Sequence, residues 1–252
     1  MVAWTLDRLA APPRWHCSGD DAIAAFSTRQ GGVSAPPYDS LNLGRSTADD
    51  PAAIEFNRAH LLRSLALDPD RLATAGQVHG AAVTRVHAPG LHRECDALVT
   101  TVSDLPLAVS SADCLPVLVA ARGAIGAAHS GWRGTTLGIA VAVLDAVCAA
   151  SGTRVDQATI HLGPGVRGCC YQVGPEVAEQ FPATCVSRRG ESLYLDVPQA
   201  VRMQLLEHGV LPEQLHDVGA CTMCQPDWYF SHRRDRGLTG RQWGVIARRE
   251  GP

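Results

Sequence analysis

The chain contains no lysine, and all 22 of its basic residues are arginine. Without lysine there can be no Schiff base on a side-chain amine, no lysine general base and no P-loop of the kind that cradles nucleotide phosphates. Any site for an anion must therefore be built from arginine, histidine, backbone N–H groups or a metal ion.

Two further absences narrow the class of protein. No apolar run reaches the ~18 residues that a membrane-spanning helix requires, and the N-terminal segment MVAWTLDRLAAPPRW has an aspartate and two prolines where a signal peptide has its apolar region. The formal net charge of -3 and the pI near 6.3 leave no basic footprint for nucleic acid. We therefore expect a cytoplasmic protein that binds neither nucleic acid nor membrane.

The cysteines lack the pattern of a disulfide framework or of a zinc finger. There are nine, an odd number with irregular spacing, which favours reduced thiols. Cys221 and Cys224 form a Cys-x-x-Cys pair, but no second pair stands at zinc-finger spacing, and the adjacent Cys169 and Cys170 are more typical of packing residues. We expect no structural zinc site from this pattern.

The 252 residues, 46% of them hydrophobic, provide ample material for a packed core. No repeat, low-complexity segment or long linker divides the chain, so we expect a single catalytic domain over residues 1–252. Strand and helix patterns alternate without a regular βαβ rhythm, which favours an α/β (α+β) fold with mixed sheets. Helices are predicted from Asp50-Pro51 to Leu65, over Thr135–Ala150 and from Asp196 to Leu206.

One stretch, Ser110–Gly134, brings a thiol and an imidazole together. Two apolar runs flank Arg122-Gly123 and predict a hairpin, in which Cys114 would lie opposite His129 within about a residue. A cysteine and a histidine so placed suit a metal site or a thiolate paired with a base. A buried cysteine beside a hydrogen-bonded histidine is the structural alternative, but the polar residues on either side of the pair argue against it.

His79 is a third candidate ligand, because Gly80 next to it would let another group approach the ring. Two histidines and a cysteine with one open position are typical of a catalytic zinc. Blue-copper centres also use two histidines and one cysteine. Multicopper oxidases need further histidines in closely spaced pairs, and the chain has no His-x-His, so copper is the weaker candidate.

Arginines provide the candidate anion sites. Arg29 and Asn42 lie in a Gly/Pro-rich segment that is either a spacer or a binding loop. Arg133-Gly134 directly precedes the predicted Thr135–Ala150 helix, whose free N–H groups favour anions. Arg233 and Arg234 belong to the densest positive segment, which is either a solvated loop or an oxyanion clamp.

Seven motifs occur along the chain in a specific order and spacing. They are Thr28-Arg29-Gln30-Gly31-Gly32-Val33-Ser34, Ser40-Leu41-Asn42-Leu43, Gln77-Val78-His79-Gly80, Asp96-Ala97-Leu98-Val99-Thr100, Ala112-Asp113-Cys114, His129-Ser130-Gly131-Trp132-Arg133-Gly134 and the tail from Arg233-Arg234-Asp235 to Thr239-Gly240-Arg241. From Phe26 to Arg241 the chain thereby resembles the laccase-domain family, whose members have been called polyphenol oxidases, purine nucleoside phosphorylases and peptidoglycan editing factors.

The resemblance implies a compact sandwich of mixed β-sheets flanked by helices, and a catalytic zinc held by His79, Cys114 and His129. It implies phosphorolysis of adenosine, inosine and methylthioadenosine, and deamination of adenosine, with a purine nucleoside and phosphate as the small-molecule partners. We assign substrate or phosphate binding to seven residues: Arg29, Asn42, Gln77, Arg133, Arg233, Arg234 and Arg241. The chain departs from the family pattern at Ser130, where alanine is common, and at His232, where tyrosine is common.

Two other functions remain open. The same metal site would suit an amidase that acts on UDP-muramoyl amino acids, with the arginines holding the pyrophosphate. Cys114 and His129 alone would suit a metal-free hydrolase or acyl transferase, which would survive chelation and form a covalent adduct on the thiol.

Overall fold

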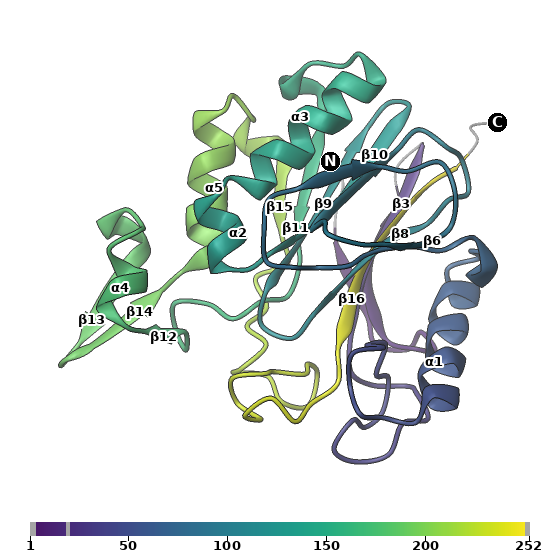
Figure 1. Ribbon diagram of the computed structural model, residues 1–252, viewed down its shortest axis with the longest axis horizontal. Helices are drawn as coiled ribbons and strands as arrows, with labels where there is room; N and C mark the ends of the chain where they lie inside the picture. The colour runs from purple at the N-terminus through teal and green to yellow at the C-terminus, as the bar shows by residue number, and fades with distance from the viewer. Residues whose placement is uncertain (1–3, 19–20, 250–252) are drawn as a thin grey trace.

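The computed structural model describes residues 4–18 and 21–249, and its centre is a pair of β-sheets (Figure 1). The larger sheet contains two parallel pairs, β4 with β6 and β4 with β8, while its other neighbours are antiparallel. In spatial order its strands are β1 (Thr5–Asp7), β2 (Arg14–Ser18), β3 (Ala22–Ser27), β16 (Gln242–Arg248), β8 (Leu107–Ser111), β4 (Ala73–Ala75) and β6 (Gly90–His92).

The second sheet is also mixed, since β15 pairs parallel with β11 and β5 pairs parallel with β7. In spatial order its strands are β15 (Leu215–Asp217), β11 (Thr159–Leu162), β9 (Leu115–Ala121), β10 (Ala124–Ser130), β7 (Ala97–Thr100) and β5 (Val83–Arg85). The mixed α/β fold predicted from the sequence is confirmed.

Alternate residues of the central strands face opposite layers, because successive side chains of a strand point to opposite faces. Phe26, Leu118 and Ile125 belong to the buried cluster between the two sheets. Val117 and Val119, one residue to either side of Leu118, belong instead to the cluster under the helices. Strands buried on both faces read as continuous apolar runs, as the two runs of the central hairpin do.

Helices cover both outer faces (Figure 1). Helix α1 (Pro51–Ser64) packs Leu61 and Leu62 against the seven-stranded sheet, and α3 (Ile139–Ser151) and α5 (Val197–Glu207) pack against the six-stranded sheet. The remaining described elements are α2 (Trp132–Thr136), α4 (Pro175–Ala178), the sheet of β12 (Gln172–Val173), β14 (Ser192–Leu195) and β13 (Val186–Arg189), and the 3-10 turns η1 (Pro69–Arg71), η2 (Val155–Gln157), η3 (Ala183–Cys185) and η4 (Pro212–Gln214). The layers are therefore helix, sheet, sheet and helix.

Two of the predicted helix starts are confirmed in detail. The Asp50 carboxylate accepts the backbone N–H of Ala52, and the Asp196 carboxylate accepts that of Gln199. Such caps stabilise a helix by about 1 kcal/mol each. The predicted helix over Thr135–Ala150 is wrong in one respect: Gly138, at φ 75°, separates α2 from α3. Arg133 therefore lies inside the short helix α2 and does not precede a long one.

The central hairpin forms as predicted, but its register differs. Ala121 pairs with Ala124, so the loop is only Arg122-Gly123 and His129 lies opposite Pro116. Cys114 follows on opposite Gly131, two residues from the predicted position. Gly131 therefore stands across from Cys114, one residue beyond the last strand pair, and the His129 ring reaches the thiol from a position two residues away.

Across residues 4–18 and 21–249, no helix combines the length and the apolar character needed to cross a membrane.

Candidate functional site

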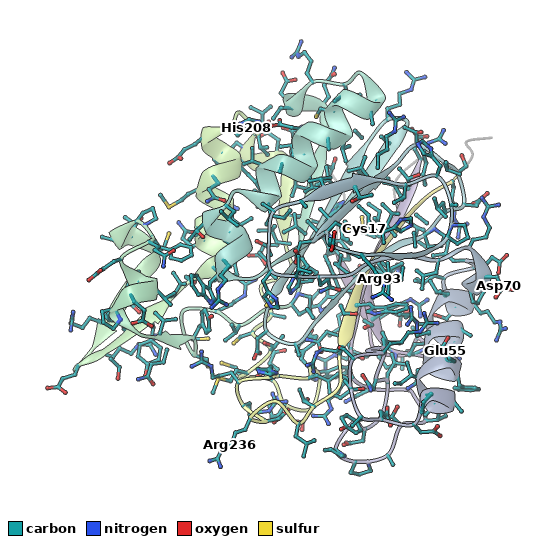
Figure 2. The ribbon with its side chains drawn as sticks, viewed as in Figure 1. Cys17, Glu55, Asp70, Arg93, His208 and Arg236 are labelled. Atoms are coloured by element: carbon teal, nitrogen blue, oxygen red, sulfur yellow. The ribbon has the colours of Figure 1, made fainter. Side chains whose placement is uncertain are left out.

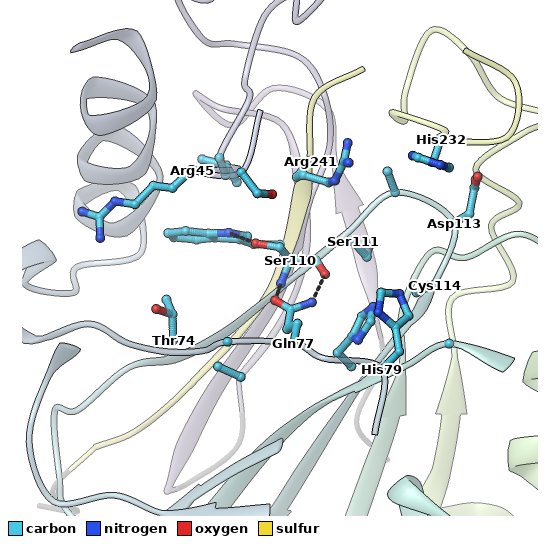
Figure 3. A pocket seen from close by; sticks show the side chains of 18 of the residues that line it. Arg45, Thr74, Gln77, His79, Ser110, Ser111, Asp113, Cys114, His232 and Arg241 are labelled. Atoms are coloured by element: carbon cyan, nitrogen blue, oxygen red, sulfur yellow. Dashed lines mark hydrogen bonds between the residues drawn. The ribbon is translucent and has the colours of Figure 1, made fainter. Parts of the chain in front are cut away.

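A cavity of about 730 Å³ lies where ends of the two sheets meet (Figure 3). The seven-stranded sheet contributes Thr74 and Ala75 of β4, Gly76 and Gln77 directly after it, and Trp243 near the start of β16. The segment from Ser110 to Cys114 leads from β8 to β9, and the segment from His129 to Arg133 leads from β10 into α2. Residues far apart in the sequence therefore share one cavity because both sheets end there.

His79, Cys114 and His129 lie together in the wall of this cavity. Their ligand atoms all lie within 4.8 Å of one another, and the two imidazole rings are nearly perpendicular, at 83° with centroids 4.9 Å apart. His79 has a positive φ of 63° in the loop between β4 and β5, a strained conformation for a residue with a side chain. Such strain persists only where surrounding contacts impose it.

Asp96 imposes that conformation. Its buried carboxylate accepts backbone N–H groups from Val78 at 3.1 Å, His79 at 3.0 Å and Gly80 at 2.7 Å. The same carboxylate lies 2.9 Å from Nδ1 of His129. Burial by itself raises the pKa of Asp96, but the hydrogen bonds from His129 and from this backbone outweigh it and lower the pKa. An ionised Asp96 thus fixes the positions of both histidines.

The electrostatics make Cys114 a thiolate near neutral pH. Burial raises the pKa of its thiol, but the charge of His129 and hydrogen bonds from His129 and His79 outweigh burial and lower the pKa to about 6. Burial likewise lowers the pKa of His129, and the Cys114 charge together with Asp96 raises it to about 9. The group can therefore act as a set of metal ligands or as a thiolate–imidazolium pair.

Gly131 leaves the space beside the thiol. A Cβ atom at this position would lie 3.0 Å from Sγ of Cys114 and 3.3 Å from Cδ2 of His79. A side chain here would therefore crowd two of the three candidate ligands.

Arginines surround the rest of the cavity. Arg133 lies with its guanidinium 4.3 Å from the ring of Trp132, and Arg233 lies 5.3 Å from the ring of Tyr171. Asp113 is the one carboxylate in the described lining, and it accepts hydrogen bonds from Thr222 and from the Arg233 backbone. The other lining cations are Arg45, Arg58 and Arg241. The lining is therefore rich in positive charge and suits an anionic ligand.

Of the seven residues assigned to substrate or phosphate, four line the cavity: Gln77, Arg133, Arg233 and Arg241. Gln77 is committed to the protein, since its amide donates to the carbonyl of Ser110 at 2.7 Å and accepts its N–H at 2.8 Å (Figure 3). Gln77 thus joins the loop that carries His79 to the end of β8. Both atoms of its amide are used in this contact, so its role in the cavity is to position the loop.

The structure places the other three outside the lining. Arg29 pairs with Asp39 and lies over the ring of Phe230, and Arg234 binds Asp235 together with the carbonyls of Thr222 and Tyr229. Asn42 is fully buried; its amide donates to Thr47 and Asp49, and its oxygen accepts the backbone N–H of Gly44 and Arg241. Arg236, in the same positive segment as Arg234, points away from the body of the molecule (Figure 2).

Sequence reasoning missed several residues of the site. Arg45 and Tyr171 line the cavity but come from segments without a motif signal. His232 also lines it, at the position where the chain departs from the family pattern. Asp96 belongs to a motif already noted in the sequence, and a lone acidic residue before an apolar strand was the signal that could have marked it.

Comparison with known proteins defines the class. A profile described as multi-copper polyphenol oxidoreductase laccase matches residues 23–249, and the chain belongs to this family. A Deinococcus radiodurans protein named purine nucleoside phosphorylase is 42% identical over 236 residues, which are 90% of this chain and 90% of that one. The resemblance seen in the motifs is thereby confirmed.

Solved structures agree on the fold. The crystal structure of YlmD from Geobacillus stearothermophilus is 33% identical with a TM-score of 0.88, covering 94% of this chain and 96% of its own. The structure of the Bacillus licheniformis hypothetical protein YfiH is 30% identical with a TM-score of 0.90, covering 97% of this chain and 98% of its own.

Proposed function

We propose that the protein is a zinc-dependent purine nucleoside phosphorylase, which cleaves adenosine, inosine and methylthioadenosine with phosphate and also deaminates adenosine. The observation that carries the proposal is the group of His79, Cys114 and His129, with ligand atoms within 4.8 Å, in a cavity surrounded by arginines. The name of the Deinococcus relative supports the substrate class.

The donor set fits zinc. One thiolate and two imidazoles are borderline-soft ligands, and three protein ligands leave the open position typical of catalytic zinc. The low pKa of Cys114 supplies the thiolate, Gly131 leaves space beside it, and Asp96 orients His129 through Nδ1, so that Nε2 is free for the metal. When bound, zinc supplies a Lewis acid with room for one further ligand. Copper also binds two histidines and a cysteine and is the second choice.

The arginines supply the phosphate site of this proposal. Phosphorolysis forms a bond between a phosphate oxygen and C1′ of the ribose and breaks the bond from C1′ to the purine, which leaves with the electron pair. Guanidinium groups bind phosphate oxygens in bidentate fashion and stay charged throughout. Arg133, Arg233 and Arg241 would hold the attacking phosphate, and Gln77 keeps the wall between them and His79 in place. We propose that the whole chain acts as one catalytic domain, because both sheets supply residues to this cavity.

The proposal is tested with zinc-loaded protein and adenosine, inosine or methylthioadenosine, with and without phosphate. The expected products are the free base and the ribose 1-phosphate or its methylthio analogue, formed only with phosphate, and inosine from adenosine. Cys114→Ala should lose the zinc held by His79, Cys114 and His129 together with turnover, whereas Cys148→Ala, a buried cysteine in α3, should keep both. Full turnover by Cys114→Ala without this zinc would overturn the proposal.

Two arms of the same experiment address the other functions. Release of an amino acid from a UDP-muramoyl substrate, with no nucleoside cleavage, would identify an amidase. The low pKa of the Cys114 thiol also suits a nucleophile. Turnover that survives a chelator and leaves a covalent adduct on Cys114 would identify a metal-free hydrolase.

A further inference from the structure

Four cysteines meet at one point outside the cavity described above. Cys169 and Cys170 lie in the segment between β11 and β12, and Cys221 and Cys224 follow β15. Their four sulfur atoms all lie within 4.8 Å of one another. The sequence has no second cysteine pair at zinc-finger spacing, but the fold supplies one from an earlier segment: Cys169 and Cys170 precede Cys224 by 55 and 54 residues.

The spacing of the sulfurs suits a single metal ion. Zinc binds thiolate sulfur at about 2.3 Å, so a regular tetrahedron of four sulfurs has edges of about 3.8 Å. Sγ of Cys224 lies 3.1 Å from that of Cys170 and 3.4 Å from that of Cys169, and no pair in the set exceeds 4.8 Å. All four cysteines are free thiols in the structure. An iron–sulfur cluster would have to fit inorganic sulfides between its thiolates, which this compact set does not accommodate.

The backbone holds the two segments together independently of the cysteines. Gly165 donates its N–H to the carbonyl of Ala220, and its own carbonyl accepts the N–H of Thr222, both at 3.2 Å. These two bonds flank Cys221 and align the two segments in parallel. Arg167 adds a salt bridge to Asp217 and a hydrogen bond to the carbonyl of Ala220. The four sulfurs thus converge on a preformed framework, which is what a metal site requires.

We propose that Cys169, Cys170, Cys221 and Cys224 bind one zinc ion as a tetrathiolate, in a structural site separate from His79, Cys114 and His129. Four cysteines complete the tetrahedron and leave no open position, which is the pattern of a structural zinc. Binding releases the thiol protons, and the chelate closes the two segments into one unit. The proposal stands on these four residues alone and does not depend on the reaction proposed above.

The site has a consequence for the cavity. Thr222, inside the Cys-x-x-Cys pair, donates its hydroxyl to Asp113 at 2.7 Å, and Asp113 precedes Cys114. Tyr171 follows Cys170 directly and lines the cavity under Arg233. A zinc ion at the four cysteines would therefore stiffen one wall of the cavity from outside.

The test counts zinc in purified wild-type protein and in three variants by elemental mass spectrometry. We expect two zinc ions per chain in the wild type and one each in Cys114→Ala and Cys224→Ser. Cys185→Ala, a buried cysteine outside both groups, is the matched control and should keep two. Loss of the second ion should also lower the Tm of Cys224→Ser by roughly 5–10 °C relative to this control.

Cobalt decides the ligand identity, even if Cys224→Ser fails to fold. Cys114→Ala reconstituted with Co²⁺ should show the strong thiolate-to-cobalt charge-transfer bands and the red d–d bands of a tetrahedral all-sulfur site. No bound metal in Cys114→Ala, or an unchanged zinc count in Cys224→Ser, would each overturn the proposal. A single zinc in the wild type that Cys114→Ala keeps and Cys224→Ser loses would support the four-cysteine site and count against the zinc of the proposed function. A wild-type thiol titration that finds these four cysteines oxidised to disulfides would also overturn it.

Discussion

Oδ1 of Asp96 lies 2.9 Å from Nδ1 of His129, and the same atom accepts the backbone N–H of His79 at 3.0 Å. One carboxylate oxygen therefore orients one imidazole through its ring and the other through its backbone. Because histidine ligands depend on such partners for tautomer and direction, Asp96 is the residue on which the geometry of the group rests.

The first prediction replaces this carboxylate. In Asp96→Asn the amide nitrogen must face at least one backbone N–H of the loop from Val78 to Gly80, so an accepted hydrogen bond is lost. We expect zinc affinity to fall by about 10–100-fold, the usual cost of losing an orienting partner. Competition with a chromophoric chelator measures it. Asp156→Asn, a substitution on the surface turn η2, is the control, and equal affinities in both variants would contradict the role given to Asp96.

A second prediction concerns the space beside the thiol. In Gly131→Ala the new Cβ would lie 3.0 Å from Sγ of Cys114, so the sulfur or the strand end must shift. At Gly80 the nearest atom, Oδ2 of Asp96, would lie 3.6 Å from a Cβ, which is ordinary contact. We therefore expect Gly131→Ala to lose at least about tenfold in zinc affinity, since zinc ligation tolerates only a few tenths of an ångström. Gly80→Ala should lose far less, and the same chelator titration compares the two. A larger loss in Gly80→Ala would contradict the steric argument.

A third prediction concerns Arg133. A charged hydrogen bond to an anion is worth about 1.5–3 kcal/mol, so Arg133→Gln should raise the KM for phosphate by roughly tenfold or more. The metal content should stay unchanged, because Arg133 is not among the candidate ligands. Arg122→Gln, at the hairpin turn, is the control and should leave the KM for phosphate as it is. Steady-state phosphorolysis at varied phosphate measures both, and an unchanged KM in Arg133→Gln would remove this residue from the phosphate site.

The sequence predicted which candidate metal ligands lie together better than it predicted which arginines line the cavity, and the reason is physical. His79, Cys114 and His129 lie next to strand ends, where a few residues of register decide which side chains meet, so even a hairpin register two residues off kept Cys114 near His129. Arginine side chains are long, and their partners are set by tertiary contacts. Arg29 and Arg234 therefore bind protein carbonyls and carboxylates outside the cavity. Arg45 lines the cavity, although no sequence motif marked it.

The four cysteines show the same limit for long-range contacts. The spacing along the sequence identifies Cys221 and Cys224 as a pair and shows no second pair at zinc-finger distance. The parallel pairing of β11 with β15, continued by the bridge between Gly165 and Cys221, brings their segment beside Cys169 and Cys170. The order of strands in a sheet depends on the packing of the whole chain, so it cannot be predicted from the residue pattern of one strand.

The last prediction is a pH dependence of stability that arises at His161, on the six-stranded sheet. Its ring is 3% exposed and accepts a hydrogen bond from Nε1 of Trp4 at 3.0 Å. Burial, with a smaller contribution from the neighbouring His216, lowers the pKa of His161 from 6.5 to about 3. The folded protein therefore keeps His161 neutral at a pH where the unfolded chain protonates it.

The direction follows from proton binding. Above about pH 6.5 the His161 ring is neutral in both the folded and the unfolded states, so it does not reduce the stability of the protein. Between about pH 6.5 and 3 the unfolded chain binds more protons than the folded protein, so the unfolding free energy falls by up to about 1.4 kcal/mol per pH unit. His161→Gln keeps an acceptor for Trp4 but cannot titrate. Between pH 7 and 5, the wild type should lose about 2 kcal/mol more unfolding free energy than this variant, as urea denaturation would measure. Equal losses in the two proteins would mean that His161 has the same pKa in the folded protein as in the unfolded chain, which would contradict its burial as a neutral ring.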